Sequence, residues 1–140
     1  MATVRYREMI PEDFDALHDL WSQTPGIGVT KRDSPEGLSF FLERNPGLSA
    51  IAESGGQIVG AIMCGHDGRN GYLHHLVVYP PFRRQGIASR LVQGSLDLLE
   101  QIGVQKCHLF IHRYNESGLK FWESIGWKER IELTMASYTF

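Results

Sequence analysis

Neither cysteine nor basic charge is abundant in this chain of 140 residues. Its two cysteines, Cys64 and Cys107, are too few for the disulfide framework of a small secreted domain and favour a reduced cytoplasmic compartment. The formal net charge of -2 argues against general binding to nucleic acids or membrane surfaces, which usually requires a basic excess. No apolar run reaches the roughly 20 residues of a membrane helix, and the N-terminus lacks an apolar signal core. We therefore expect a cytoplasmic protein without nucleic-acid or membrane partners.

Several common catalytic motifs are also missing from the sequence. There is no G-x-x-x-x-G-K-[ST] loop, no G-x-G-x-x-G opening a helix and no G-x-S-x-G nucleophile elbow. The chain has six histidines, but neither C-x-x-C nor H-E-x-x-H occurs, and scattered histidines in strands are usually structural. These absences argue against the common nucleotide loops and the serine hydrolase elbow, and we expect no metal.

The order of apolar patterns and turn signals predicts a single α/β domain over residues 1–140, long enough for a core without disulfide or metal support. Strands are expected at 3–9, 48–52, 57–65, 72–78, 106–112, 128–131 and 134–140. Helices are expected to begin near Pro11 and Ser34 and to cover 87–102 and 115–124. Glycine turns at 54–56 and 67–71 make residues 48–78 an antiparallel meander, and the strand–helix–strand unit after it implies a parallel pair.

The strongest signal is the stretch Leu76–Leu91, LVVYPPFRRQGIASRL. An apolar strand breaks at two prolines, passes through a basic loop and continues as an apolar-periodic helix. The first N–H groups of a helix have no intrahelical partner, and the helix dipole adds positive charge there. Gly86 lets the backbone approach an anion closely, and Arg83 and Arg84 add charge. The stretch therefore predicts a site for a pyrophosphate group.

This stretch resembles motif A of the GNAT superfamily of acyl-CoA-dependent N-acetyltransferases, a strand ending V-x-P followed by [RQ]-x-x-G-x-[GA]. The match is carried by Val78-Tyr79-Pro80 and by Arg83-Arg84-Gln85-Gly86-Ile87-Ala88. The segment Asn115–Trp127 is similar to the family's C-terminal pattern N-x-x-[AG]-x-x-[LF]-Y-x-x-x-G-[FW]. The resemblance covers nearly the whole chain. It implies a GNAT fold, α/β (α+β), with a mixed, mostly antiparallel central sheet of about seven strands in the order β-α-α-β-β-β-α-β-α-β-β.

The resemblance also implies an activity. Members of this family move the acetyl group of acetyl-CoA, a co-substrate, to a primary amine of a small molecule or peptide. The amine attacks the thioester directly within a ternary complex. Specificity would lie in the loop 26–33, in the helix after it and in the turn at 67–70. A homodimer is compatible with this fold.

Coenzyme contacts follow from the resemblance residue by residue. The loop would hold the pyrophosphate, through Arg83, Arg84, Gln85, Gly86, Ile87, Ala88 and Ser89. The backbone of Leu76, Val77 and Val78 would form a track for the pantetheine arm, because the matching strand separates there from the next parallel strand. Asn115 would hydrogen-bond the pantetheine, although its position fits an N-cap of the following helix equally well.

His74 is the first candidate for the base that removes a proton from the ammonium. In a regular strand Tyr72, His74 and Leu76 share one face, and some family members place base residues at the positions of Tyr72 and His74. A histidine near its reference pKa of about 6.5 can accept the proton directly or through water. A β-bulge would swap the parity and favour His75. For each histidine taken alone, packing against a helix is an equally good interpretation.

The sequence departs from the family pattern at Trp122, where a tyrosine usually protonates the leaving thiolate. An indole N–H donates a hydrogen bond but supplies no proton near neutral pH. Trp122 would then pack beside the coenzyme arm, and Tyr114, Tyr72 or water would supply the proton. The alternative function is a non-catalytic acyl-CoA-binding or sensory module on the same fold.

Overall fold

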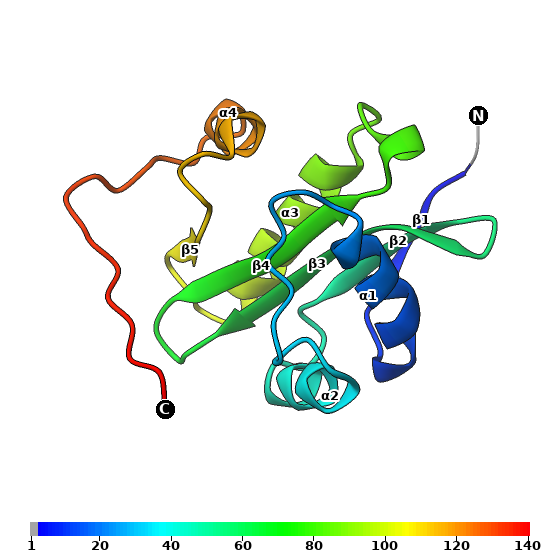
Figure 1. Cartoon of the computed structure of the whole chain (residues 1–140), viewed down its shortest axis with the longest axis horizontal. Coiled ribbons are helices and arrows are strands. Elements are labelled where there is room, and N and C mark those ends of the chain that lie inside the picture. The colour runs from blue at the N-terminus through cyan, green and yellow to red at the C-terminus, as the bar shows by residue number, and fades with distance from the viewer. Residues whose placement is uncertain (1–2) are drawn as a thin grey trace. The chain divides into compact units, whose positions relative to one another are not determined.

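The computed structural model describes residues 3–140 (Figure 1). They divide into two compact units, one ending at Phe110 and one comprising Ile111–Phe140. The elements in chain order are β1 (Arg5–Glu8), the 3-10 helix η1 (Pro11–Asp13), α1 (Phe14–Ser22), α2 (Pro35–Arg44), β2 (Ala50–Ser54), β3 (Gln57–His66), β4 (Gly71–Val78), the 3-10 helix η2 (Pro80–Phe82), α3 (Ile87–Gln101), β5 (Cys107–Leu109) and α4 (Glu116–Ser124).

The first unit is built on one five-stranded sheet with the strand order β1-β2-β3-β4-β5. Strands β1 to β4 pair antiparallel in sequence order, whereas β4 and β5 are parallel. A parallel pair needs a crossover connection, and α3 provides it. The predicted α/β class with a mixed, mostly antiparallel sheet is confirmed.

Two turns set the antiparallel meander of β2, β3 and β4. Gly55 and Gly56 have φ of 58° and 78°, and a two-residue hairpin turn of this type requires positive φ at both positions. In the β3–β4 turn, Asp67 Oδ1 accepts hydrogen bonds from the N–H groups of Asn70 and Arg69, each at 2.8 Å. These bonds stabilise the carboxylate and lower the pKa of Asp67. The meander predicted for residues 48–78 is therefore confirmed.

Helices cover both faces of the sheet, with α1 and α2 in front and α3 behind in Figure 1. Helix α2 begins as the sequence predicts, since Ser34 Oγ accepts a hydrogen bond from Gly37 N–H at 3.0 Å and Pro35 occupies the first turn. Helix α3 ends just before Gly103, whose φ of 91° favours glycine. Its apolar stripe lies against β2, β3 and β4.

One part of the core lies between the sheet and the helices α1 and α2. It consists of Met9, Leu17, Leu20, Trp21, Leu38, Ile51, Ala61, Met63 and Val77. On the opposite face, Ile87 and Leu91 of α3 approach Gly60, where a Cβ would lie 3.0 Å and 3.3 Å from their side chains. A glycine in β3 thus lets the first turn of α3 pack closely on the sheet.

An ion-pair network joins β1, η1 and β2. Arg7 donates two hydrogen bonds to Asp13, at 2.8 Å and 2.9 Å, and one to Glu53 at 3.1 Å. Burial of Asp13 alone would raise the pKa of its carboxyl, but hydrogen bonds from Arg7 and from the Ile10 N–H outweigh burial and lower it. The sequence reading missed this network, because the three partners are separated along the chain.

The second unit corrects two predictions. Only α4 is regular there, and the strands expected at 128–131 and 134–140 are absent, so the sheet of about seven strands is wrong and five are described. Every side chain from Lys128 to Phe140 is exposed. The segment alternates apolar and polar residues, but alternation alone does not make a strand, since a strand requires hydrogen bonds from a neighbouring one. The strand expected at 106–112 is also shorter, because pairing with β4 stops at Leu109.

Candidate active site

Strand β4 has an open edge over its second half. It pairs with β5 only through Gly71, Tyr72 and Leu73, and then continues to Val78. From His74 onward, no strand formed by residues 3–140 pairs with this edge. The predicted separation of the two parallel strands is therefore present.

Backbone groups at the end of β4 point toward this open edge. The Tyr79 N–H donates to the Val59 carbonyl of β3 at 2.8 Å, so the backbone N–H of Tyr79 points toward β3. Alternate residues of an antiparallel strand direct their N–H and C=O groups to opposite sides, so those of Val78 point away from β3. The Val78 carbonyl accepts a hydrogen bond from Arg83 Nε at 3.1 Å. The backbone N–H of Val78 is directed at the open edge.

A β-bulge interrupts β4 at His75. Val77 pairs with Ala61 and His74 with Met63, so three steps along β4 match two along β3. His75 has a φ of 49°, in the left-handed region that residues with side chains rarely adopt. His74 and Val77 therefore lie on one sheet face, and a shared face for His74 and Leu76 is a wrong expectation. The extra residue shifts the alternation by one position.

Both histidines face the α1–α2 side of the sheet. The His74 ring lies edge-on to Phe41 of α2, with ring centroids 5.9 Å apart. Burial lowers the pKa of His74, Coulombic interactions with His75 and Arg32 lower it further, and Asp33 opposes them. His74 is therefore a neutral imidazole at neutral pH.

His75 is held by two contacts from other elements. Its Nε2 lies 3.0 Å from Asp33 Oδ1 in the loop between α1 and α2, and its ring lies edge-on to Trp21 of α1, with centroids 4.9 Å apart. The Trp21 indole is buried, and its Nε1 has no hydrogen-bond partner among residues 3–140.

Tyr72 shares the face of His74 but packs toward β5. Its ring is stacked on Phe110, with centroids 6.1 Å apart, and lies 5.8 Å from the His108 ring. The three predicted catalytic residues therefore line one face of β4, with Tyr72 at the end where β5 is still paired.

Asp33 and Trp21 contact the candidate residue His75, and sequence reasoning missed both contacts. Asp33 belongs to the predicted specificity loop, but the sequence of a loop does not tell which strand residue it contacts. Trp21 belongs to the apolar stripe of α1, so the sequence indicates only that its side chain is buried, as it is. Both reach His75 only because the chain folds over β4.

The loop after β4 forms an uncapped helix start. Arg83, Arg84, Gln85 and Gly86 are exposed, and no side chain caps the first turn of α3. The first bond into this helix runs from the Arg90 N–H to the Gly86 carbonyl at 3.0 Å, so the N–H groups of residues 87–89 lack intrahelical acceptors. Gly86 has a φ of 79° and Arg84 a φ of 63°, which turn the backbone sharply. The arrangement suits an anion.

Asn115 and Trp122 belong to the second compact unit, where their contacts are local. Asn115 Oδ1 accepts a hydrogen bond from Gly118 N–H at 3.0 Å, so the predicted N-cap is confirmed. The Trp122 ring packs edge-on against Phe121 and Trp127, with centroids 5.2 Å and 5.0 Å away. Trp122 is half-buried in this aromatic cluster.

The cysteines are poor nucleophiles. Burial raises the pKa of the Cys64 thiol to about 12 and that of Cys107 to about 11, so both stay protonated near neutral pH. Among residues 3–140, no group of three or more His, Cys, Asp or Glu is arranged to hold a metal ion. None of the helices in this described part combines the length and apolar character needed to cross a membrane.

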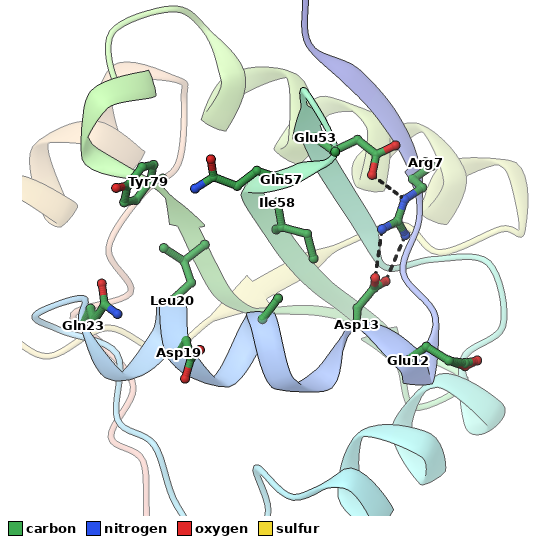
Figure 2. A pocket seen from close by; sticks show the side chains of 12 residues that line it. Arg7, Glu12, Asp13, Asp19, Leu20, Gln23, Glu53, Gln57, Ile58 and Tyr79 are labelled. Carbon is green, nitrogen blue, oxygen red and sulfur yellow. Dashed lines mark hydrogen bonds and ion pairs between the residues drawn. The ribbon is translucent and has the colours of Figure 1, made fainter.

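A separate hollow of ≈ 610 Å³ lies beside α1 and the β2–β3 hairpin. Figure 2 shows Arg7, Asp13 and Glu53 at one end, and Gln23 and Tyr79 at the other. The hydrogen bonds of Arg7 to both carboxylates close the first end. The lining includes neither His74 nor His75, so the hollow is distinct from the bulge of β4.

Comparison with known proteins decides the family. The model of the acetyltransferase (GNAT) family matches residues 14–127. The chain belongs to this family. An acetyltransferase of Pectobacterium atrosepticum is 32% identical over 114 residues, which cover 81% of this chain and 80% of that protein. This GNAT protein is therefore an acyltransferase that moves the acetyl group of acetyl-CoA, its co-substrate, to an amine, as its sequence resemblance implies.

Two further similarities agree with the GNAT assignment. N-alpha-acetyltransferase 30 of Schizosaccharomyces pombe is 32% identical over 92 residues, covering 62% of this chain and 61% of that protein. The PaiA N-acetyltransferase of Thermoplasma acidophilum, whose structure is a complex with coenzyme A, superposes with a TM-score of 0.79 over 90% of both chains at 22% identity. The second similarity confirms the GNAT fold despite the strand count.

Proposed function

We propose that acetyl-CoA binds along β4 and the start of α3. Its pyrophosphate accepts hydrogen bonds from the N–H groups of Arg84–Ser89, with Arg83 and Arg84 adding positive charge. Its pantetheine arm follows the open edge at Leu76–Val78, where the Val78 N–H is directed outward. The acetyl group then lies near the bulge, beside His74 and His75, and the amine attacks it directly in a ternary complex.

One observation carries this proposal: β4 leaves β5 after Leu73, and η2 and a short loop then lead from its end to an uncapped helix start. The open edge supplies backbone groups for amides, and the helix start supplies N–H groups for an anion. Pyrophosphate and pantetheine amides follow one another in coenzyme A in this same order. Because Arg83 already donates to the Val78 carbonyl, we assign Arg83 mainly to positioning the loop.

Gly86→Glu tests the placement of the coenzyme. The glutamate adds negative charge beside the pyrophosphate and strains a backbone with a φ of 79°. We expect acetyl-CoA binding measured by calorimetry to weaken about 100-fold, the loss of roughly two charge-assisted hydrogen bonds.

Gly47→Glu is the matched control. Gly47 has a φ of 76°, and no atom lies within 4 Å of a Cβ built there or at Gly86, so both variants add equal charge and similar strain. Wild-type affinity for acetyl-CoA in Gly86→Glu, or an equal loss of affinity in the two variants, would contradict the placement of the coenzyme at the start of α3.

The direct attack predicts a specific kinetic pattern. Initial rates measured against acetyl-CoA at several acceptor concentrations should give intersecting lines, whereas an acetyl-enzyme intermediate gives parallel ones. Suitable acceptors come from a panel of amino acids, diamines and short peptides with free N-termini. The peptides are included because N-alpha-acetyltransferase 30 is among the relatives. Parallel lines would exclude direct attack.

We assign Trp122 to packing beside the coenzyme arm and Asn115 to a hydrogen bond with the pantetheine, through the amide N–H₂ left free by its N-cap. The thiolate then takes its proton from Tyr72, Tyr114 or water. Trp122→Tyr should retain most of the turnover, since it keeps an aromatic ring there. Trp122→Ala should raise the KM for acetyl-CoA and lower the stability by up to about 3–5 kcal/mol, the cost for a fully buried ring. An inactive wild type beside an active Trp122→Tyr would contradict this role.

Residues 1–140 form one N-acetyltransferase domain in this proposal. The family match at 14–127 spans both compact units, which supports it. A cytoplasmic location is supported by two cysteines without a disulfide, and the net charge of -2 supports an activity without nucleic acid.

A further inference from the structure

His75 is placed more tightly than a surface histidine would be. Its backbone is in the left-handed region, with a φ of 49°, so the strand itself turns the residue out of the regular alternation. Asp33 contacts the ring at 3.0 Å and Trp21 packs edge-on against it at 4.9 Å. Only 20% of the His75 side chain is exposed. Two elements outside the sheet thus determine the orientation of the imidazole.

Asp33 is itself held rigidly. Its Oδ2 accepts a hydrogen bond from Thr30 N–H at 2.8 Å, and its own N–H donates to the Thr30 carbonyl at 2.9 Å. The next residue, Ser34, caps α2. The Asp33 side chain is 11% exposed. The carboxylate is therefore fixed by the loop and by the start of α2, with one oxygen left for His75.

This contact selects one form of the imidazole. A carboxylate accepts hydrogen bonds and donates none, so the proton of a neutral His75 ring lies on Nε2. The lone pair is then on Nδ1, which has no hydrogen-bond partner among residues 3–140. We infer that Asp33 is a positioning residue of the acetyl transfer, which holds His75 with Nδ1 as the proton acceptor for the amine substrate. This inference rests on the proposed function, since it places the amine beside the bulge.

The proton and electron balance is simple. Nδ1 takes one proton from the substrate ammonium, and His75 becomes an imidazolium stabilised by Asp33. The freed lone pair forms the N–C bond, and the C–S bond breaks with its electrons on sulfur. The thiolate takes a proton from Tyr72, Tyr114 or water, the proton lost from the new amide nitrogen replaces it there, and His75 releases its own proton to water. Among the neighbouring groups, His74 on β4 interacts electrostatically with His75, Arg32 and Asp33. The rings that contact the two histidines from α1 and α2, Trp21 on His75 and Phe41 on His74, are uncharged.

Nitrogen NMR of the free enzyme tests the tautomer without any acceptor. Long-range ¹H–¹⁵N spectra distinguish a protonated Nε2 from a protonated Nδ1, and loss of a signal in His75→Gln assigns it. We expect the Nε2–H form in wild type and a mixture of both forms in Asp33→Asn, because an amide donates as readily as it accepts. A predominant Nδ1–H form in wild type, or an unchanged tautomer in Asp33→Asn, would overturn the inference.

Kinetics test whether the orientation matters for turnover. Asp33→Asn should lower kcat about 10- to 100-fold, part of the gain usually attributed to a general base. Its affinity for acetyl-CoA should change less than about twofold, and Asp33→Glu should recover part of the rate. The double variant Asp33→Asn/His75→Gln should be no slower than His75→Gln alone, because residues acting as a unit are not additive. Asp97→Asn, on the exposed side of α3 and bonded to Gln93, is the control with unchanged rates.

The outcomes separate this inference from the placement of the coenzyme. Additive losses in the double variant, or lower thermal stability in Asp33→Asn with an unchanged kcat, would reduce Asp33 to a structural tether of the loop. If Gly86→Glu binds acetyl-CoA normally while the effects of the Asp33 and His75 variants are not additive, the placement of the coenzyme is wrong. The role of Asp33 in positioning His75 would then still hold.

Discussion

His74 shows how one half-buried histidine makes the stability of the protein depend on pH. Its pKa is lowered by burial beside Phe41 and by nearby positive charge, so the folded protein resists protonation at this position. An unfolded chain binds the same proton near the reference pKa of about 6.5. The unfolded state therefore gains protons first as the pH falls, and the contribution of neutral His74, present above about pH 6.5, is lost at lower pH.

We predict that His74→Gln reduces this pH dependence. Urea unfolding at about pH 7.5 and about pH 5.5 should show that wild type loses more free energy of unfolding than His74→Gln over this interval. His75 and Asp33 are present in both proteins, so their contributions cancel. Equal losses in the two proteins would show that His74 is not the group that resists protonation.

At the level of elements, the packing of α3 on the sheet depends on where glycine replaces a side chain. A Cβ at Gly71 of β4 would lie 2.6 Å from Leu99 Cδ1 and 3.3 Å from Cys107 Sγ. At Gly94, within α3, nothing lies within 4 Å of the added atom. The same substitution therefore has opposite consequences at the two positions.

We predict that Gly71→Ala lowers the free energy of unfolding by about 1–3 kcal/mol, because it overpacks the contact with α3. Gly94→Ala should raise it by about 0.5–1 kcal/mol, because alanine favours the helix. The urea midpoints of both variants measure this. A stable Gly71→Ala would show that α3 moves away from β4 at little cost.

The elements also show where sequence reasoning succeeds and where it stops. The turn at Gly55 and Gly56, the cap at Ser34 and the helix start at Gly86 were predictable, because each depends on residues next to one another in the chain. From the sequence, the bulge at His75 is only an alternative to a regular strand, because it depends on how β3 and β4 match. Asp33 was not paired with His75 in advance, since 42 positions separate them.

At the level of the whole molecule, the three tryptophans report on both compact units. Trp21 lies in the first unit, and Trp122 and Trp127 pack together in the second. If residues 1–140 are one domain, the two units unfold together. Labelling with 5-fluorotryptophan gives a separate ¹⁹F signal for each ring, so one sample follows both units.

We predict that the three signals change with one common urea midpoint. Acetyl-CoA at a concentration 100 times its Kd should raise the free energy of unfolding by about 2.7 kcal/mol. The urea midpoint of all three signals should therefore rise together. A lower midpoint for Trp122 and Trp127 alone would make Ile111–Phe140 a separately unfolding part and contradict the single domain.

Sequence patterns alone suffice to predict the family, the loop at Arg83–Ser89 and the order of helices and strands through α4. These depend on local patterns: turn glycines, helix caps and the two periodicities of apolar residues. The folded chain is needed to show which histidine Asp33 contacts, which face His75 occupies and where β4 leaves β5. Register and loop contacts are choices among distant partners, and a strand pattern such as that of residues 128–140 is satisfied only when a neighbouring strand supplies hydrogen bonds.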